Sequence, residues 1–288
     1  MEEQQLPPLV SFGTYKLKGK SCYDAILGAL EMGYRSIDTA RVYGNEREVG
    51  EAMLASGISR PELFVTSKIA PADMESEETA YVAILTSLCD LKTKYLDLCL
   101  IHWPGKSKTA SSDFQANKAA RLGAWRALLR AKHEGLCRHV GVSNYLTRHM
   151  DEMKEEGMEA PTVNQIEVHP LFRQEALRAD CARRGIAVQA YSSLGSSVPE
   201  ARAALLEHPS VLQVAAQQGL SSAQVCLLWA AQQGLPCIPK ASSSAHMREN
   251  LETLQLGAGS EAVLSAEQMA ALSALAEQKL CWDPDGVL

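Results

Sequence analysis

The chain of 288 residues is long enough for one large domain or two small ones, so length leaves the number of domains open. Hydrophobic residues make up 46% of it and charged residues 22%, which is typical of a globular protein with a sizeable buried core. The formal net charge of −6 argues against general nucleic-acid binding, which requires a basic surface, although a local basic pocket for one phosphate is still compatible with it.

Short apolar runs alternate along the chain with longer segments of helical periodicity. The predicted strands end near Tyr15, Asp38, Lys68, His102, Asn144, Glu167, Ser192 and Lys240. The predicted helices are Tyr23–Met32, Glu46–Ala55, Glu77–Leu88, Lys118–Glu134, His149–Glu155, Glu175–Arg184, Ala223–Gln232 and, packed outside the others, Ala266–Ala276. Long loops are expected at Pro104–Asn117 and Leu194–Pro209. Glycines that would end a helix in a left-handed conformation are Gly33, Gly57, Gly135, Gly185 and Gly234.

Strand and helix repeat about eight times without a linker, which is the pattern of a parallel (β/α)8 barrel. A doubly wound sheet alternates in the same way, but when it binds a dinucleotide it normally carries Gly-x-Gly-x-x-Gly after its first strand. The only Gly-x-Gly here, Gly257-Ala258-Gly259, lacks the third glycine. We therefore predict one α/β domain over residues 1–288, a (β/α)8 TIM barrel with an additional C-terminal helix.

Several classes of protein are disfavoured by what the sequence lacks. Residues Met1–Gln5 have neither the basic nor the apolar region of a secretory signal, and no apolar run approaches the roughly 18 residues of a membrane span. The eight cysteines are scattered, and no His or Cys cluster has the spacing of zinc ligands. We expect a cytoplasmic monomer with reduced thiols and no metal, which acts on a small molecule and binds neither nucleic acid nor membrane.

Polar side chains stand at the ends of three successive predicted strands. Asp38 and Tyr43 follow the second strand, Lys68 ends the third, and His102 follows the fourth. The carboxyl ends of parallel strands meet at one rim of a barrel, where barrel enzymes place their active sites. Taken singly, each residue type more often caps, packs or faces solvent. Four of them at adjacent strand ends favour a catalytic site.

These four residues could protonate a carbonyl oxygen during reduction. A phenol with a pKa of about 10 is a weak acid at neutral pH, but a nearby ammonium lowers that pKa and a carboxylate keeps the ammonium charged. We therefore expect Asp38 and Lys68 to activate Tyr43, and His102 to donate a hydrogen bond to the same oxygen. The hydride must come from a cofactor, because no side chain supplies one.

A series of short motifs, in order along nearly the whole chain, resembles those of the aldo-keto reductase family. They are Gly13–Lys16, Gly33–Ala40, Tyr43–Glu46, Thr66–Lys68, Leu98–Pro104, Gly141–Asn144, Asn164–Pro170, Ala190–Gly195 and Ile238–Lys240. In its compact form the chain is similar to 2,5-diketogluconate reductases and kinetoplastid prostaglandin F synthases. The resemblance implies a barrel enzyme that reduces aldehydes and ketones to alcohols with NADPH, an alcohol:NADP⁺ oxidoreductase.

The resemblance also implies a role for each matching residue. Asp38, Tyr43, Lys68 and His102 match the catalytic tetrad, and Tyr191 matches the aromatic residue that stacks on the nicotinamide. The matches to other cofactor contacts are Ser143, Asn144 and Gln165 at the carboxamide, Ser192 and Leu194 near the pyrophosphate, Lys240 at the 2′-phosphate, and Glu249 and Asn250 at the adenine. The substrate pocket is expected to be lined by Tyr15, Tyr43, Ile69, His102 and Trp103.

Two positions depart from the family pattern near the expected 2′-phosphate site. After the lysine the family usually has Ser, and six residues past it Arg, where this chain has Ala241 and His246. A neutral imidazole holds a phosphate less tightly than a guanidinium does, and Ser242, Ser243 and Ser244 are expected to add hydrogen bonds. NADPH is therefore the expected cofactor, and use of NADH stays open.

Two other classes of protein compete with a barrel reductase as interpretations of this sequence. A structural or binding protein of the same fold, as among channel β-subunits and lens crystallins, would not need an intact tetrad. A short-chain dehydrogenase would carry Tyr-x-x-x-Lys, and none of the eight tyrosines has a lysine four residues on. The short segment after Trp282 leaves no room for the long C-terminal loop of steroid-handling relatives. We therefore expect an open pocket that accepts small aldehydes, α-keto carbonyls or quinone-like dicarbonyls.

Overall fold

The computed structural model describes residues 7–259 and 263–288, so the segment tested above for a secretory signal lies outside the described residues. Seven parallel strands form one curled sheet in chain order. They are β1 (Phe12–Gly13), β2 (Ser36–Asp38), β3 (Phe64–Ile69), β4 (Leu96–Ile101), β5 (Cys137–Ser143), β6 (Val163–Glu167) and β7 (Ala187–Tyr191). Each ends within two residues of its predicted end, which confirms the first seven predicted strands.

The eighth expected strand, ending near Lys240, is present only as isolated bridges. Cys237 pairs in parallel with both Val10 and Ala190. Its N–H donates to Leu9 O at 2.9 Å, and Ala190 N–H donates to Pro236 O at 2.7 Å. Pro236 and Pro239 have no N–H to extend this pairing. The segment 236–239 therefore lies between β7 and the residues leading into β1 without forming a regular strand.

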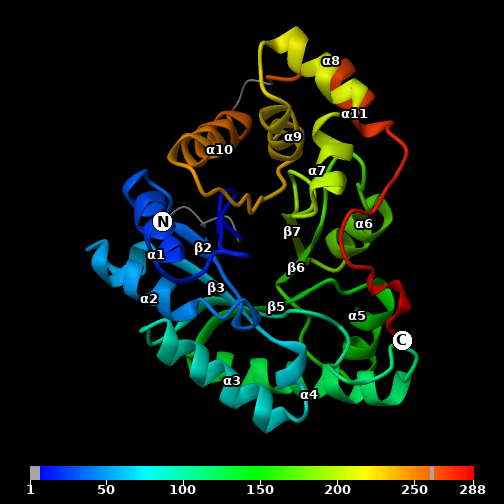
Figure 1. Cartoon of the computed structure of the whole chain (residues 1–288). Coiled ribbons are helices and arrows are strands. Elements are labelled where there is room, and N and C mark those ends of the chain that lie inside the picture. Colours follow the sequence, from blue (N-terminus) through cyan, green and yellow to red (C-terminus); the bar gives the residue numbers. More distant parts are fainter. Residues whose placement is uncertain (1–6, 260–262) are drawn as a thin grey trace.

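Helices surround the sheet in chain order (Figure 1). The predicted helices are confirmed as α1 (Gly19–Glu31), α2 (Glu46–Ala55), α3 (Glu77–Asp90), α4 (Phe114–His133), α5 (Thr147–Glu155), α6 (Glu175–Arg183), α9 (Ser222–Ala231) and α11 (Ala266–Ser273). Short 3-10 helices are η1 (Arg41–Tyr43), η2 (Arg60–Glu62), η3 (Pro71–Asp73) and η4 (Pro284–Gly286). The glycines expected to end helices do adopt left-handed backbone, with φ of 76° at Gly135 and 71° at Gly185.

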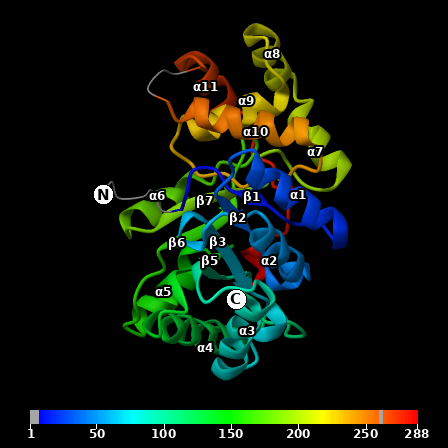
Figure 2. The ribbon, with the colours of Figure 1, turned by 90° about the vertical axis from the view of Figure 1, so that its left-hand side faces the viewer.

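Three helices were not predicted: α7 (Pro199–Leu206), α8 (Pro209–Gln218) and α10 (Ser244–Gly257). The expected loop Leu194–Pro209 is therefore wrong over α7. Proline stands at the first position of α7 and of α8; it is common in loops, but it is also well tolerated where the first N–H groups of a helix have no partner. Figure 2 shows α8 to α11 gathered over one end of the molecule and α3 to α5 at the other.

The core lies within the sheet and between the sheet and the helices around it. All six residues of β3 and all six of β4 are buried. Trp125 in α4 and Trp229 in α9 are among the largest fully buried side chains of the core. Among the described residues, no helix is both long and apolar enough to cross a membrane.

Candidate active site

The four predicted catalytic residues come together at the ends of neighbouring strands. Asp38 is the last residue of β2, Lys68 is the last but one of β3, and His102 directly follows β4. Tyr43 ends the 3-10 helix η1, whose turn after β2 is closed by a hydrogen bond from Tyr43 N to Ala40 O. The ring centroids of Tyr43 and His102 are 5.5 Å apart, so the phenol and the imidazole lie side by side.

A buried ion pair lies beneath the Tyr43 ring. Lys68 Nζ is 2.6 Å from Asp38 Oδ1 and 2.8 Å from Thr39 O, and it lies 5.3 Å from the centroid of the Tyr43 ring. The side chain of Lys68 is fully buried and that of Asp38 is 5% exposed. Burial lowers the pKa of Lys68, and the adjacent Asp38 carboxylate opposes this by stabilising the ammonium. The Asp38 carboxylate therefore helps Lys68 to keep its positive charge at a buried position where an isolated lysine would lose it.

The pKa of Tyr43 moves in the opposite direction to the sequence-based expectation. Burial raises the pKa of the phenol well above 10, and the Asp38 carboxylate raises it further. Lys68 donates its hydrogen bonds to Asp38 Oδ1 and Thr39 O. The hydroxyl of Tyr43 therefore stays protonated throughout the neutral range, as a proton donor must be.

His102 is neutral at ordinary pH in this environment. Burial lowers the pKa of the imidazole to about 3, and the Lys68 ammonium lowers it too. Its Nδ1 is buried and has no hydrogen-bond partner among the described residues. A neutral imidazole carries one N–H, so it can act beside Tyr43 as a hydrogen-bond donor without bringing a second positive charge.

The residues expected at the nicotinamide form one hydrogen-bonded group beside the ion pair. Tyr191 Oη donates to Asn144 Oδ1 at 2.7 Å, and Asn144 Nδ2 donates to Ser143 Oγ at 3.0 Å and to His102 O at 3.1 Å. Gln165 Nε2 donates to Asp38 Oδ2 at 2.8 Å. Asn144 has a φ of 63°, a left-handed conformation that Asn tolerates better than most residues. These contacts join the expected cofactor residues directly to the expected catalytic pair.

Aromatic side chains form the outer wall of the site. The ring centroids of Tyr15 and Tyr43 are 5.1 Å apart, and those of Tyr15 and Trp282 are 6.0 Å apart. Trp103 is partly exposed after β4. Ile69, which was also expected to line the pocket, is only 2% exposed and follows Lys68 in β3. Because side chains alternate along a strand, Ile69 faces the opposite side of the sheet, and that expectation is wrong.

Trp282 was not predicted to belong to this wall, and a carboxylate anchors the segment that carries it. Glu167, the last residue of β6, accepts hydrogen bonds from Leu280 N at 2.7 Å and Cys281 N at 3.1 Å. His169 Nε2 lies 3.0 Å from Glu167 Oε1, so the same carboxylate also holds the segment that follows β6. No spacing in the sequence links residue 167 to residues 280 and 281, so only the fold reveals these contacts.

The residues expected at the far end of the cofactor lie along the segment after the Cys237 bridge and in α10. Lys240, Ser242, Ser243 and His246 are all exposed, and Ser243 caps α10 by accepting from His246 N at 3.3 Å. Glu249 accepts from Ser221 Oγ at 2.7 Å, and Asn250 is only 3% exposed. Ser192, with a φ of 53°, and the buried Leu194 follow β7. The structure thus presents the lysine and the serines to solvent, but not Asn250.

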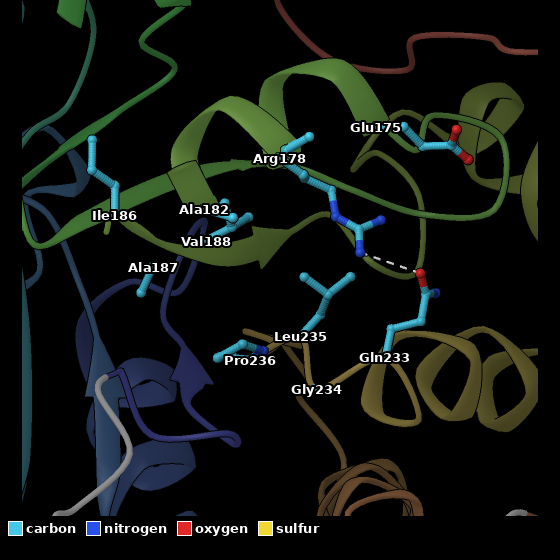
Figure 3. Close-up of a pocket in the computed structure, with 11 residues that line it drawn as sticks. Glu175, Arg178, Ala182, Ile186, Ala187, Val188, Gln233, Gly234, Leu235 and Pro236 are labelled. Carbon is cyan, nitrogen blue, oxygen red and sulfur yellow. Dashed lines mark hydrogen bonds between the residues drawn. The ribbon is translucent and has the colours of Figure 1, made fainter. Parts of the chain in front are cut away.

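A groove of about 620 Å³ lies away from this site, between α6, the start of β7 and residues 233–236 (Figure 3). Arg178 Nη2 donates to Gln233 Oε1 at 3.2 Å across it. The groove touches Ala187 at the amino-terminal end of β7, whereas Tyr191 stands at the carboxyl end. The groove and the aromatic-walled site are therefore at opposite ends of the sheet.

The chain is similar to known proteins over nearly its whole length. The aldo/keto reductase family model matches residues 9–277. An aldo-keto reductase of Mycolicibacterium vanbaalenii is 38% identical over 277 residues, which cover 96% of this chain and 91% of the relative. Glyoxal reductase of Bacillus subtilis is 35% identical over 283 residues, covering 98% and 94%. The crystal structure of an aldo-keto reductase enzyme from a Medee basin deep-sea metagenome library has a TM-score of 0.84 at 30% identity, covering 96% and 95%. The chain therefore belongs to the aldo/keto reductase family.

Proposed function

We propose that the protein reduces aldehydes and ketones to alcohols with NADPH, and that Tyr43 is the general acid. The observation that carries the proposal is the buried Lys68–Asp38 pair beneath the Tyr43 ring, with His102 beside it, in a member of this family. We further propose that residues 1–288 act as one barrel domain, in which segment 236–239 takes the place of the eighth strand.

Each of the four side chains has a different role in protonating the carbonyl oxygen. Tyr43 holds a proton in the neutral range, because burial and Asp38 disfavour the phenolate. The uncharged His102 donates its single N–H to the same oxygen and so fixes where that oxygen lies. As the oxygen becomes negative, Tyr43 transfers its proton, and Lys68 stabilises the phenolate that remains. Asp38 keeps Lys68 charged for that moment.

The residues present fit a nicotinamide cofactor, which when bound would supply a hydride to the carbonyl carbon. Tyr191 is partly exposed at the end of β7, so its ring is available for stacking. Ser143, Asn144 and Gln165 provide the amide and hydroxyl groups that a carboxamide can pair with, at the ends of β5 and β6, and Gln165 reaches Asp38 by a hydrogen bond. These residues would hold and orient the ring against the carbonyl group beside Tyr43.

NADPH is favoured over NADH by the charge and dipole at the other end of the site. Lys240 is exposed just before α10, a helix of 14 residues whose first turn follows Ser243. The amino-terminal end of a helix carries a partial positive charge and free N–H groups that suit a phosphate. Ser242 and Ser243 add hydroxyl donors, and His246, being less well suited than an arginine, limits the preference for NADPH.

Small and polar carbonyl compounds are the substrates we propose. The wall of Tyr15, Trp103 and Trp282 is aromatic, and Trp282 is 62% exposed, so the mouth of the site is open to solvent. Glyoxal reductase is among the relatives, which supports α-dicarbonyl and small aldehyde substrates for this chain.

Replacing Tyr43 by Phe tests the proposal, because it removes the hydroxyl and keeps the ring that packs against Tyr15 and His102. We expect kcat/KM for a small aldehyde to fall by at least about 100-fold, the usual contribution of a general acid, while the Kd for NADPH stays within about twofold. Tyr23→Phe, which alters a tyrosine in α1 away from the site, is the matched control. Retention of more than about a third of wild-type kcat in Tyr43→Phe would remove Tyr43 from the mechanism.

A further inference from the structure

Both hydrogens of the Gln165 amide have acceptors, and one of these acceptors has no role in the mechanism above. Gln165 Nε2 donates to Asp38 Oδ2 at 2.8 Å and to Gln189 Oε1 at 2.9 Å. The register of β6 and β7 pairs Gln165 with Gln189, so the two side chains extend from the same face of neighbouring strands. Gln165 is 3% exposed and Gln189 1% exposed, so water competes little for these bonds.

The hydrogen bonds continue from Gln189 across the interior and return to the strand that carries Asp38. Gln189 Nε2 donates to Ser11 Oγ at 3.4 Å, and Ser11 Oγ is 2.7 Å from Ser36 Oγ. Ser36 and Asp38 are two residues apart in β2, on the same face of that strand. The side chains of β2, β7 and β6, together with Ser11 before β1, thus form a buried circuit that begins and ends on β2.

This circuit decides which way each amide points. A side-chain amide can rotate by 180°, which exchanges its oxygen with its NH₂ group. The Asp38 carboxylate pairs with the NH₂ of Gln165 and would repel its oxygen. Gln189 reinforces this orientation by presenting its own oxygen, and its contact with Ser11 uses its NH₂. Gln165 Oε1 is thereby directed away from both partners.

We propose that Gln189 is a positioning residue for the nicotinamide, acting through Gln165. By accepting one hydrogen of the Gln165 amide, Gln189 holds Gln165 Oε1 ready to accept from the NH₂ of the nicotinamide carboxamide. The second hydrogen of the same amide fixes the Asp38 carboxylate, whose other oxygen binds Lys68. Gln189 therefore links the orientation of the cofactor to that of the ion pair, although it touches neither substrate nor cofactor. This inference rests on the nicotinamide site proposed above.

The test compares binding of the whole cofactor with binding of a fragment that lacks the nicotinamide. Gln189→Met keeps the length of the side chain and removes the acceptor, so the Gln165 amide loses a partner. We expect the Kd for NADPH, measured by quenching of protein fluorescence, to rise about tenfold, the usual effect of losing one buried hydrogen bond. The Kd for adenosine 2′,5′-bisphosphate, which has no nicotinamide, should stay within about twofold.

Two further variants distinguish positioning from a general loss of structure. Gln189→Glu, studied at pH 6, retains an acceptor oxygen; a carboxyl group buried there stays protonated and mimics the amide, so NADPH affinity should return to within about threefold of wild type. Gln233→Met changes an amide in the remote groove and should alter neither Kd. If Gln189→Met does not fold, Ser11→Ala frees Gln189 Nε2 instead and should weaken NADPH binding about threefold.

Equal binding of NADPH by wild type and the Gln189→Met or Ser11→Ala variant would overturn the inference. So would an equal loss for NADPH and the bisphosphate, because that result indicates general destabilisation. Failure of the wild-type protein to bind NADPH at all would instead refute the proposed function, and the two failures are therefore distinguishable.

Discussion

Replacing Asp38 by Asn perturbs the best-defined electrostatic contact in the molecule. Lys68 Nζ and Asp38 Oδ1 are 2.6 Å apart, with the lysine side chain fully buried. The substitution removes the negative charge and keeps the shape. It also replaces one of the two carboxylate oxygens by an NH₂ group. That group would face either Lys68 or Gln165 Nε2, and two donors would then point at each other. The variant therefore loses an ion pair and a hydrogen bond together.

The size of the effect follows from the geometry. With an effective dielectric constant of about 20, two charges 2.6 Å apart attract by roughly 6 kcal/mol, and the cost of burying both charges offsets much of this. Removing one partner leaves the other charge buried, which destabilises proteins by about 3–5 kcal/mol. Asp24→Asn is the matched control, since its partner Lys20 is 85% exposed and such surface pairs contribute at most about 1 kcal/mol.

Urea unfolding of both variants measures the difference. We expect Asp38→Asn to lower the free energy of unfolding by about 3–5 kcal/mol at pH 7 and Asp24→Asn to change it by less than about 1 kcal/mol. The deficit of Asp38→Asn should shrink as pH rises toward 9. The Asp38 carboxylate opposes the lowering of the Lys68 pKa by burial, so this pKa falls further in the variant. Once the pH exceeds it, the folded variant holds neutral lysine while the unfolded chain still binds the proton, and stability rises with pH. Similar losses in the two variants would refute this account of the pair.

Two other changes give equally direct tests. His246→Arg should lower the Kd for NADPH about tenfold and leave that for NADH unchanged, because a guanidinium can pair with the 2′-phosphate through two hydrogen bonds; equal changes for both cofactors would place residue 246 elsewhere. His149 accepts from Leu146 N through Nδ1, and its Nε2 lies 2.9 Å from Val287 O, so it is neutral, and burial lowers its pKa to about 4. The unfolded chain therefore takes up a proton first as pH falls, and between pH 7 and 5 the site loses about 2 kcal/mol of stability. His149→Gln should remove that part of the pH dependence in urea unfolding, and an unchanged slope would show that other groups cause it.

The positions of the strands and of most helices could be predicted because they depend on local patterns. Apolar periodicity placed β2, β3 and β4. The residues at or just after their carboxyl ends, Asp38 to Tyr43, Lys68 and His102, then had to meet at one rim of a parallel sheet. Helices α7, α8 and α10 were not predicted; α7 and α8 begin with proline and α10 follows serines, and both features are compatible with a loop as well as with the start of a helix. Met247, Leu251 and Leu254 of α10 do recur at helical spacing, so a local signal for this helix is present in the sequence.

By itself the sequence determined the order of the elements and which polar residues could share a site, since both depend on patterns among residues close together in the chain. Only the tertiary structure decided the electrostatics. Burial raises the pKa of Tyr43 where residue types alone suggested a lower one, because desolvation depends on atoms brought from several strands. The same holds for Gln189 and Trp282, which reach the site through contacts between residues far apart in sequence. No local pattern records such contacts, because the folded sheet alone brings their partners within hydrogen-bonding distance.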